Sequence, residues 1–257
     1  MGIRIHIMKI DLRLGDCLEV MKTIPNGSVD AIITDPPYGT TACKWDSVID
    51  FELMWEQLNR IIKPNGAIVL FGSEPFSSAL RMSNIKNYKY DWVWEKSRCG
   101  NPMLAKYQPL KKTESVLIFE KKGNKVNYYP IPRKLSEDSI KRNKARKEYK
   151  KGSKSIHINS KIIKNSFVFG MEYGYPYNIL KFNSHINTQH PTQKPVPLME
   201  YLIKTYTNEN ETVLDFTMGS GTTGVAAKNL NRNFIGIEQD DKYFEIATNR
   251  INELKLL

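Results

Sequence analysis

Apolar strands alternate with amphipathic helices along most of this chain, and that alternation is the feature that most restricts its fold. Apolar positions with a period of two predict strands, whereas apolar positions three or four residues apart predict helices. In the first half we expect strands at residues 10–14, 29–34, 67–71, near 92 and at 115–119, with helices at 18–23 and 51–62. Near the end we expect helices at 195–206, 225–230 and from 241, with strands at 212–214 and 234–237. Such alternation predicts an α/β fold with a parallel sheet covered by helices.

Between these two blocks the composition changes. The chain of 257 residues has a formal net charge of +11, and residues 133–164 hold twelve Lys or Arg against three Asp or Glu, which is +9 of that excess. The rest of the chain is therefore nearly neutral. We expect residues 1–124 and 188–257 to form one domain, and residues 125–187 to form a basic insertion.

The composition also excludes several classes of protein. No apolar run approaches the ~18 residues of a transmembrane helix, and the N-terminus does not resemble a signal peptide. The three cysteines, Cys17, Cys43 and Cys99, are too few and too far apart for a disulfide framework or a zinc cluster. We therefore expect a soluble cytoplasmic protein without a metal, whose basic excess suits a polyanionic partner.

A glycine-rich turn follows the expected strand at 212–214. Gly219, Gly221 and Gly224 form a G-x-G-x-x-G pattern, and Glu238 ends the next strand, nineteen residues after Gly219. Glycines let a ligand approach the backbone, and a carboxylate at that strand end can accept hydrogen bonds from ribose hydroxyls. The pattern indicates an adenosine-type cofactor, and the lack of a following Gly-Lys-Ser/Thr excludes a P-loop. A tight turn without a ligand and a dehydrogenase that binds NAD are the alternatives.

The strand at 29–34 ends in Asp35-Pro36-Pro37-Tyr38. Two prolines restrict the backbone, so the Asp35 carboxylate and the Pro36 carbonyl can project rigidly from the carboxyl edge of the sheet. Two acceptors beside an aromatic ring suit an amino group on a flat base, because the acceptors bind the amine and the ring stacks on the base. The motif therefore predicts chemistry at an exocyclic amine.

Together these motifs resemble those of the S-adenosylmethionine-dependent amino DNA methyltransferases, in the order usually called the beta class. The match rests on Asp35-Pro36-Pro37-Tyr38, Gly219-Ser220-Gly221-Thr222-Thr223, His190-Pro191-Thr192-Gln193-Lys194-Pro195 and the Gly15-Asp16 bend. One stretch departs from the family, which commonly has Asp-Pro-Phe where this chain has Asp215-Phe216-Thr217. The resemblance implies a Rossmann-like, doubly wound, mostly parallel sheet, the class I methyltransferase fold in permuted order, with target recognition in the insertion.

The resemblance also implies roles for single residues. Glu238 would hold the ribose, and Thr192 and Lys194 would meet the amino-acid end of the cofactor. Asp16 and Cys17 would lie by the adenine, although a helix cap and a buried thiol explain them equally well. The remaining cofactor contacts would be Asp215, Phe216, Thr217, Gly219, Ser220, Gly221 and Thr222, and the catalytic residues would be Asp35, Pro36, Pro37 and Tyr38.

The implied reaction moves a methyl group from S-adenosylmethionine to a base flipped out of double-stranded DNA, leaving S-adenosylhomocysteine. Asp35 at the first motif position, where cytosine-N4 enzymes of this arrangement commonly have Ser, favours adenine N6, with cytosine N4 as the alternative. Methylation of cytosine C5 is excluded, because it needs a cysteine that usually follows a proline, and no cysteine here does. A DNA-binding protein without catalysis and a methyltransferase of RNA or of a protein amide are further alternatives.

The DNA contacts are expected in basic segments. Lys44 lies in a loop that is a candidate to close over the flipped base, and the run Lys141, Arg142, Lys144, Arg146 and Lys147 suits phosphates, with a solvated helix face as the alternative. Phe167, Phe169, Tyr173, Tyr175 and Tyr177 alternate as in a strand or hairpin, and we expect a small core there rather than a stacking platform. The class includes homodimers and enzymes with a cognate restriction endonuclease, and it implies a bacterial, archaeal or phage protein at the nucleoid.

Overall fold

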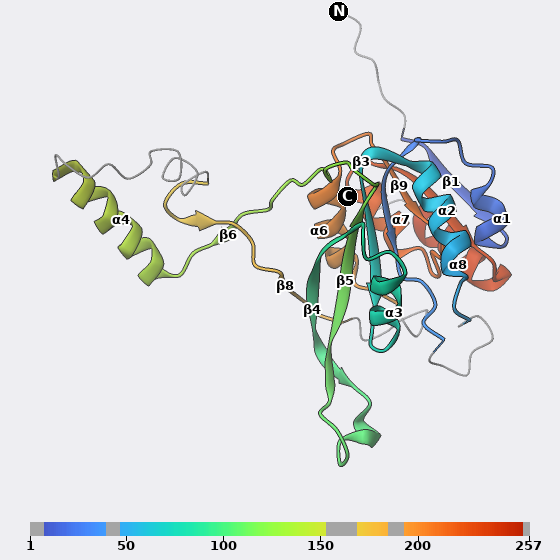
Figure 1. Ribbon diagram of the computed structural model, residues 1–257, viewed down its shortest axis with the longest axis horizontal. Helices are drawn as coiled ribbons and strands as arrows, with labels where there is room; N and C mark the ends of the chain where they lie inside the picture. The colour runs from blue at the N-terminus through green and yellow to red at the C-terminus, as the bar shows by residue number, and fades with distance from the viewer. Residues whose placement is uncertain (1–7, 40–46, 153–168, 185–192, 254–257) are drawn as a thin grey trace, which may run out of the picture. The chain divides into compact units, whose positions relative to one another are not determined.

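In the computed structural model of this protein, residues 8–39, 47–152, 169–184 and 193–253 are described. The chain divides into two units. Unit 1 consists of Met1–Tyr129 and Asn178–Leu257, and unit 2 is Pro130–Tyr177. Unit 1 contains a large sheet with its helices, and unit 2 contains a long helix and two short strands (Figure 1).

The sheet of unit 1 has eight strands in the order β1-β10-β9-β2-β3-β5-β4-β8. Only β5 runs against its neighbours, since it pairs antiparallel with both β3 and β4. The expected α/β fold with a mostly parallel sheet is confirmed. The bounds are β1 (Ile10–Leu14), β2 (Val29–Thr34), β3 (Ile62–Gly72), β4 (Tyr88–Gly100), β5 (Lys111–Glu120), β8 (Ile179–Phe182), β9 (Thr212–Asp215) and β10 (Asn233–Glu238).

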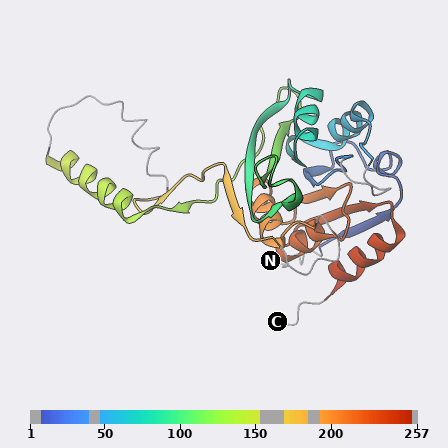
Figure 2. The same cartoon turned by 90° about the horizontal axis from the view of Figure 1, so that it is seen from below.

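Helices cover both faces of this sheet (Figure 2). Side chains that alternate along the strands separate into two apolar cores: Ile32 packs on one face, while Ala31 and Ile33 pack on the other. The core that contains Ile32 lies under α1 (Cys17–Met21), α2 (Phe51–Ile61) and α3 (Phe76–Ser83). The core that contains Ala31 and Ile33 lies under α6 (Val196–Tyr206), α7 (Thr222–Asn229) and α8 (Asp241–Asn252).

Three local expectations differ from the structure. Residues 63–66 do not separate α2 from the next strand but lie inside β3, where the register with β2 shifts between the pairs Val29↔Ile62 and Ala31↔Ala67. Helix α7 begins at Thr222, earlier than expected, and α3 has no counterpart among the expected helices. The strands near 92 and at 115–119 are the bases of much longer strands, β4 and β5, which continue to a short 3-10 turn at Pro102–Leu104.

Unit 2 consists of α4 (Glu137–Gly152) and a two-stranded sheet of β6 (Arg133–Lys134) and β7 (Tyr173–Gly174). In the described part of that stretch the expected aromatic core is reduced to one pair, because half-buried Phe169 packs edge-on against Tyr175 with ring centroids 5.0 Å apart. Tyr173, Tyr175 and Tyr177 are 43%, 49% and 64% exposed. The Arg133 guanidinium lies 3.7 Å from the centroid of the Tyr177 ring, so a cation–π contact covers one face of this exposed ring. Across the described ranges, none of the helices has the length and apolar character needed to cross a membrane.

Candidate active site

Two adjacent strands end at the same place in the middle of the sheet. Strands β2 and β9 are parallel neighbours, but β2 leads to β3 on one side while β9 leads to β10 on the other. Such a reversal opens a crevice at the carboxyl ends of the strands, where open α/β sheets bind their ligands. The Asp35 motif follows β2 and the glycine-rich turn follows β9, so the fold brings the two predicted motifs together.

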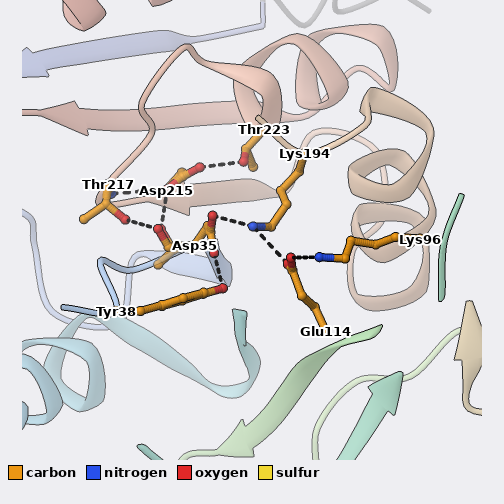
Figure 3. Close-up of polar contacts among 9 residues, drawn as sticks. Asp35, Tyr38, Lys96, Glu114, Lys194, Asp215, Thr217 and Thr223 are labelled. Carbon is orange, nitrogen blue, oxygen red and sulfur yellow. Dashed lines mark hydrogen bonds and ion pairs between the residues drawn. The ribbon is translucent and has the colours of Figure 1, made fainter. Parts of the chain in front are cut away.

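Hydrogen bonds join the two strand ends (Figure 3). The Thr34 hydroxyl donates to Oδ1 of Asp215 and accepts from the backbone N–H of Phe216 at 3.0 Å. The Thr217 hydroxyl donates to the backbone carbonyl of Asp35 at 3.1 Å. The backbone that carries the predicted catalytic motif is therefore fixed directly to the glycine-rich turn.

A cavity of about 360 Å³ lies at these strand ends in unit 1. This volume falls within the range of about 300–1,000 Å³ that is usual for small-molecule sites. Most of the predicted catalytic and cofactor residues line it: Asp16, Cys17, Asp35, Pro36, Pro37, Tyr38, Lys194, Asp215, Phe216, Thr217, Gly219, Ser220, Thr222 and Glu238.

The Asp35 carboxylate has two partners at this cavity. Its Oδ1 accepts a hydrogen bond from the Tyr38 hydroxyl at 2.5 Å, and its Oδ2 accepts one from Nζ of Lys194 at 2.5 Å (Figure 3). Burial raises the pKa of Asp35, against the opposing effect of the Lys194 ammonium. The Tyr38 ring is stacked on Phe76, with centroids 4.9 Å apart, so an aromatic neighbour fixes the plane of the tyrosine.

Lys194 belongs to a row of alternating charges that the sequence did not predict. Its Nζ is 3.2 Å from Oε2 of Glu114, whose Oε1 accepts a hydrogen bond from Lys96 at 2.9 Å. Burial disfavours the Lys194 ammonium, but the Asp35 and Glu114 carboxylates outweigh it and raise its pKa. Burial likewise disfavours the Glu114 carboxylate, but Lys194 and Lys96 outweigh it and lower its pKa. Lys194, only 7% exposed, is thus held between two carboxylates of its own chain.

Asp215, predicted as a cofactor contact, lines the cavity and accepts three hydrogen bonds from within the chain. Its Oδ2 accepts from the Thr223 hydroxyl at 2.5 Å, and its Oδ1 accepts from the Thr34 hydroxyl and from the Thr217 N–H. Burial raises its pKa to about 6, against the effect of these hydrogen bonds. These hydrogen bonds fix the turn that borders the cavity.

The other end of the cavity holds Glu238 and the start of α1. Glu238 accepts backbone hydrogen bonds from Gly219, Gln239 and Asp240, each at 2.9 Å. Burial raises the pKa of this carboxyl, and the backbone donors oppose that change.

The helix-cap interpretation of Asp16 is confirmed, whereas contact of Asp16 and Cys17 with an adenine stays a prediction. The Asp16 side chain caps α1 by accepting from the N–H groups of Leu18 and Glu19, and burial raises the pKa of Cys17 to about 12. Both residues also line the cavity.

The two glycines of the turn differ in their surroundings. Gly219 lines the cavity, whereas Gly221 has a φ of +77° and its backbone packs against α8. A Cβ at Gly221 would lie 2.9 Å from Cβ of Ala247. The absence of a side chain at Gly221 therefore lets the turn pack closely against α8.

The predicted DNA contacts are placed only in part. Thr192, predicted at the cofactor, and Lys44 lie outside the described residues, and Arg146 and Lys147 lie in α4 where side chains are not described. Lys141, Arg142 and Lys144 are exposed on α4.

The motifs assign no role to Glu114, Lys96 or Phe76. Glu114 is an acidic side chain just before the apolar run of a strand, a signal that could have singled it out, but its partner Lys194 is remote in sequence. Among the described residues, no three His, Cys, Asp or Glu side chains lie close enough together to hold a metal ion.

Comparison with known proteins agrees with this geometry. The DNA methylase family N6_N4_Mtase matches residues 29–249. The Type II methyltransferase M.HinfI of Haemophilus influenzae is 31% identical to this chain, over 94% of the chain and 68% of the relative. The Type II methyltransferase M.HpaI of Haemophilus parainfluenzae is 28% identical, over 95% of the chain and 75% of the relative.

Solved structures show the same architecture. The crystal structure of the M1.HpyAVI–SAM complex superimposes with a TM-score of 0.62 at 30% identity, covering 95% of this chain and 100% of that one. The cytosine-N4-specific PvuII DNA methyltransferase gives a TM-score of 0.64 at 18% identity, covering 97% of this chain and 88% of that one. At that identity the second likeness concerns the fold alone.

Proposed function

The chain belongs to the N6_N4_Mtase family of DNA methylases, and on that premise we propose that it methylates the exocyclic N6 amine of adenine in double-stranded DNA, with S-adenosylmethionine as the methyl donor. The observation that carries this proposal is the placement of the Asp35 carboxylate. It lies at the cavity, held by Tyr38 and Lys194, one strand away from the glycine-rich turn. The order of the motifs along the chain also supports membership of the beta class.

The residues at the cavity fit S-adenosylmethionine. Glu238 stands at the end of β10 with an acceptor for ribose hydroxyls, and Gly219 brings the backbone close. Asp16 and Cys17 give a polar and an apolar side chain where an adenine would lie. The solved relative M1.HpyAVI is a complex with this molecule. When bound, S-adenosylmethionine supplies a methyl group on a positively charged sulfur.

The protein's part in the reaction is to hold and orient the amine. Each carboxylate oxygen has two lone pairs, so Asp35 can accept a hydrogen bond from the amine while Tyr38 and Lys194 keep their own. The Pro36 carbonyl is the second acceptor. When both amine hydrogens donate hydrogen bonds, the nitrogen lone pair becomes more available for attack. The fixed backbone supplies most of the rate acceleration by positioning the amine. The methylated amine then releases a proton, for which Asp35 is the nearest carboxylate.

Adenine is proposed over cytosine because the first position of the motif is Asp35. Both bases present a conjugated amine to the same acceptors, so cytosine N4 is the second candidate. The base has to leave the duplex to reach the cavity, and stacking on the Tyr38 ring offsets part of the cost of a few kcal/mol.

We also propose that residues 125–187 recognise the target. The exposed side chains of this segment suit this role. Cations on α4 can contact phosphates, namely Lys141, Arg142 and Lys144, and aromatic rings can stack on bases, namely Tyr173 and Tyr177. Two relatives are named Type II methyltransferases, which supports a cognate restriction endonuclease as a partner. We propose as well that the protein forms a homodimer.

The test is methyl transfer followed by identification of the product. The protein is incubated with S-adenosylmethionine labelled in the methyl group and with DNA, RNA or a protein mixture, and labelled DNA is digested to nucleosides for mass spectrometry. We expect N6-methyladenine, and exclusive N4-methylcytosine would overturn the choice of base. Asp35→Asn should lower the rate at least about 100-fold, since one good acceptor becomes a donor, while cofactor binding stays within about twofold. Label in RNA or protein alone would overturn the substrate class.

A further inference from the structure

One part of unit 1 extends beyond the rest of the sheet (Figure 1). We define the β4–β5 arm as residues 96–112, the outer part of β4, the 3-10 turn and the start of β5. β3 last pairs with β5 at Gly72↔Ser115, and β8 last pairs with β4 at Lys96↔Phe182. Beyond these pairs neither strand pairs with another strand of the described sheet, so the arm is a two-stranded ribbon. Its base is held by two further contacts, because the Ser184 N–H donates to the Ser97 hydroxyl at 3.0 Å and Nζ of Lys111 donates to the Glu74 carbonyl at 3.2 Å.

The ribbon projects from the edge of the sheet that carries the active site. β5 runs antiparallel to β3, so its first residues lie past the carboxyl end of β3. That end is also the side on which β2 delivers Asp35, because β2 and β3 are parallel. The two strands of the ribbon pair irregularly here, because Gly100↔Lys111 is the next pair after Glu95↔Thr113, and the ribbon then continues to the turn at Pro102–Leu104.

The base of the arm is connected to the active site through Glu114. Lys96 donates to Glu114 at 2.9 Å, and Glu114 lies 3.2 Å from the same Lys194 nitrogen that binds Asp35. A duplex whose base reaches Asp35 therefore comes to the side of the protein from which the arm extends.

The surface of the arm is unusual for a part of a soluble domain. All of residues 101–110 are exposed, and they include Met103 at 91% and Tyr107 at 85%. Residues 96–112 contain five Lys or Arg and no Asp or Glu. Among the described residues, neither Arg98 nor Lys106 has an ion-pair partner. Exposed large apolar side chains beside unpaired cations indicate a surface for a polyanion that also offers apolar faces.

We propose that the β4–β5 arm binds DNA, entering a groove of the duplex next to the flipped base. Arg98 and Lys106 contact phosphates, and Met103 and Tyr107 pack against sugars and base faces. A major groove about 12 Å wide admits a two-stranded ribbon of this kind, and apolar tips that press on a base step help to unstack it. This inference rests on the proposed function, and it adds a DNA contact in unit 1 that is separate from the basic insertion.

The arm's chemistry favours DNA over a second copy of this chain. A second copy would place the same five cations opposite one another, with no acidic side chain within the arm to balance them. The carboxylates of Glu95 and Glu114, beside the arm on β4 and β5, already have lysine partners. The phosphates of DNA provide the missing negative charge.

The test uses the full-length protein and an unmethylated DNA fragment that the wild type has been shown to label. Met103→Ser/Tyr107→Ser and Arg98→Gln/Lys106→Gln are compared with Met82→Ser and Lys86→Gln. The controls exchange an exposed methionine and an exposed lysine near the opposite end of β4. DNA binding is measured by fluorescence anisotropy over a range of salt, S-adenosylmethionine binding by calorimetry, and association state by light scattering.

We expect the apolar pair to raise the Kd for DNA about tenfold, as the loss of a stacked side chain does. The charge pair should lower the slope of log K against log salt by up to about 2, or about 0.9 for each phosphate that is no longer neutralised. Cofactor binding and both controls should stay at the wild-type level. Wild-type DNA affinity in both arm variants would overturn the inference, as would a dimer that the apolar pair dissociates without weakening DNA binding. Failure of the wild type to label any DNA would instead overturn the proposed function.

Discussion

Nζ of Lys194 lies 2.5 Å from Oδ2 of Asp35, although the two residues are 159 positions apart in the chain. The pair is not isolated, because Glu114 approaches the same ammonium from its other side. The charge state of Asp35 therefore depends on several opposed effects. Burial and the Glu114 carboxylate raise its pKa, and the Lys194 ammonium lowers it. Each neighbour can be removed separately, and the expected changes have opposite signs.

Lys194→Met should raise the pKa of Asp35 further, because the buried carboxylate loses its cation. In the proposed reaction the ionised Asp35 carboxylate is a stronger acceptor for the amine than the protonated acid, so the acid limb of the pH–rate profile should move to higher pH. At pH 7 we expect a rate about 10- to 100-fold lower. Removing one partner of a buried pair should also cost about 3–5 kcal/mol of the free energy of unfolding, measured in urea.

The double variant Lys194→Met/Glu114→Gln is the control for that prediction. It removes the second carboxylate that the ammonium balanced, so it should regain part of the lost stability. Equal stability of the single and double variants would mean that Lys194 and Glu114 do not interact.

Glu114→Gln alone should have the reverse effect on pH dependence. With the like charge gone, the pKa of Asp35 should fall and the acid limb of the profile should move to lower pH. We expect kcat to drop only a few-fold at pH 8, and KM for S-adenosylmethionine to stay constant. The pH–rate profile of the variant measures this, and a shift toward higher pH would show that Glu114 acts mainly through packing.

Asp215→Asn should change how stability depends on pH. The pKa of Asp215 is raised to about 6 in the fold from an ordinary 3.8, so between those values the folded state binds more protons than the unfolded state. The contribution of Asp215 to stability therefore falls as pH rises through this window, by about 3 kcal/mol in total. Relative to wild type, Asp215→Asn should gain stability from pH 4 to pH 6.5. Parallel curves for the two proteins in urea would show that Asp215 titrates normally.

Gly221→Ala should destabilise the protein by about 2–3 kcal/mol. The methyl group would meet Ala247 and Ile251 of α8, and φ at Gly221 is +77°. Gly27→Ala is a matched control, since Gly27 has a φ of +59° but nothing within 4 Å of an added Cβ. The control should lose only about 1 kcal/mol for the strained backbone. Similar thermal melts of the two variants would mean that contact with α8 is unimportant at Gly221.

The sequence predicts the elements whose physical signal is local. The apolar strand at 29–34 and the helix that begins near Phe51 are predicted nearly at their observed bounds, because periodicity and the Asp50 N-cap are encoded within a few residues. The prediction for the neighbouring Lys63-Pro64-Asn65-Gly66 is wrong. Pro and Gly usually end an element, but here strand pairing resumes beyond them.

What the sequence does not predict depends on contacts between distant segments. Lys194 is expected at the cofactor because its motif suggests it, and nothing near it in the chain points to Glu114. The exposed tyrosines of unit 2 are expected in a core because alternation cannot show whether a second layer covers a strand. The arm is not predicted because only the inner parts of β4 and β5 have the apolar pattern of a buried strand.

The position of β9 has a consequence for synthesis of the protein. This strand lies between β10 and β2 in the sheet, yet it is reached only at Thr212, long after β2 and β3 have left the ribosome. Until then one edge of β2, with its backbone donors and acceptors, has no partner in the sheet. We expect the nascent chain to form β2, β3 and β5 early and to gain its active site last. Before then it is most prone to aggregation and most dependent on chaperones.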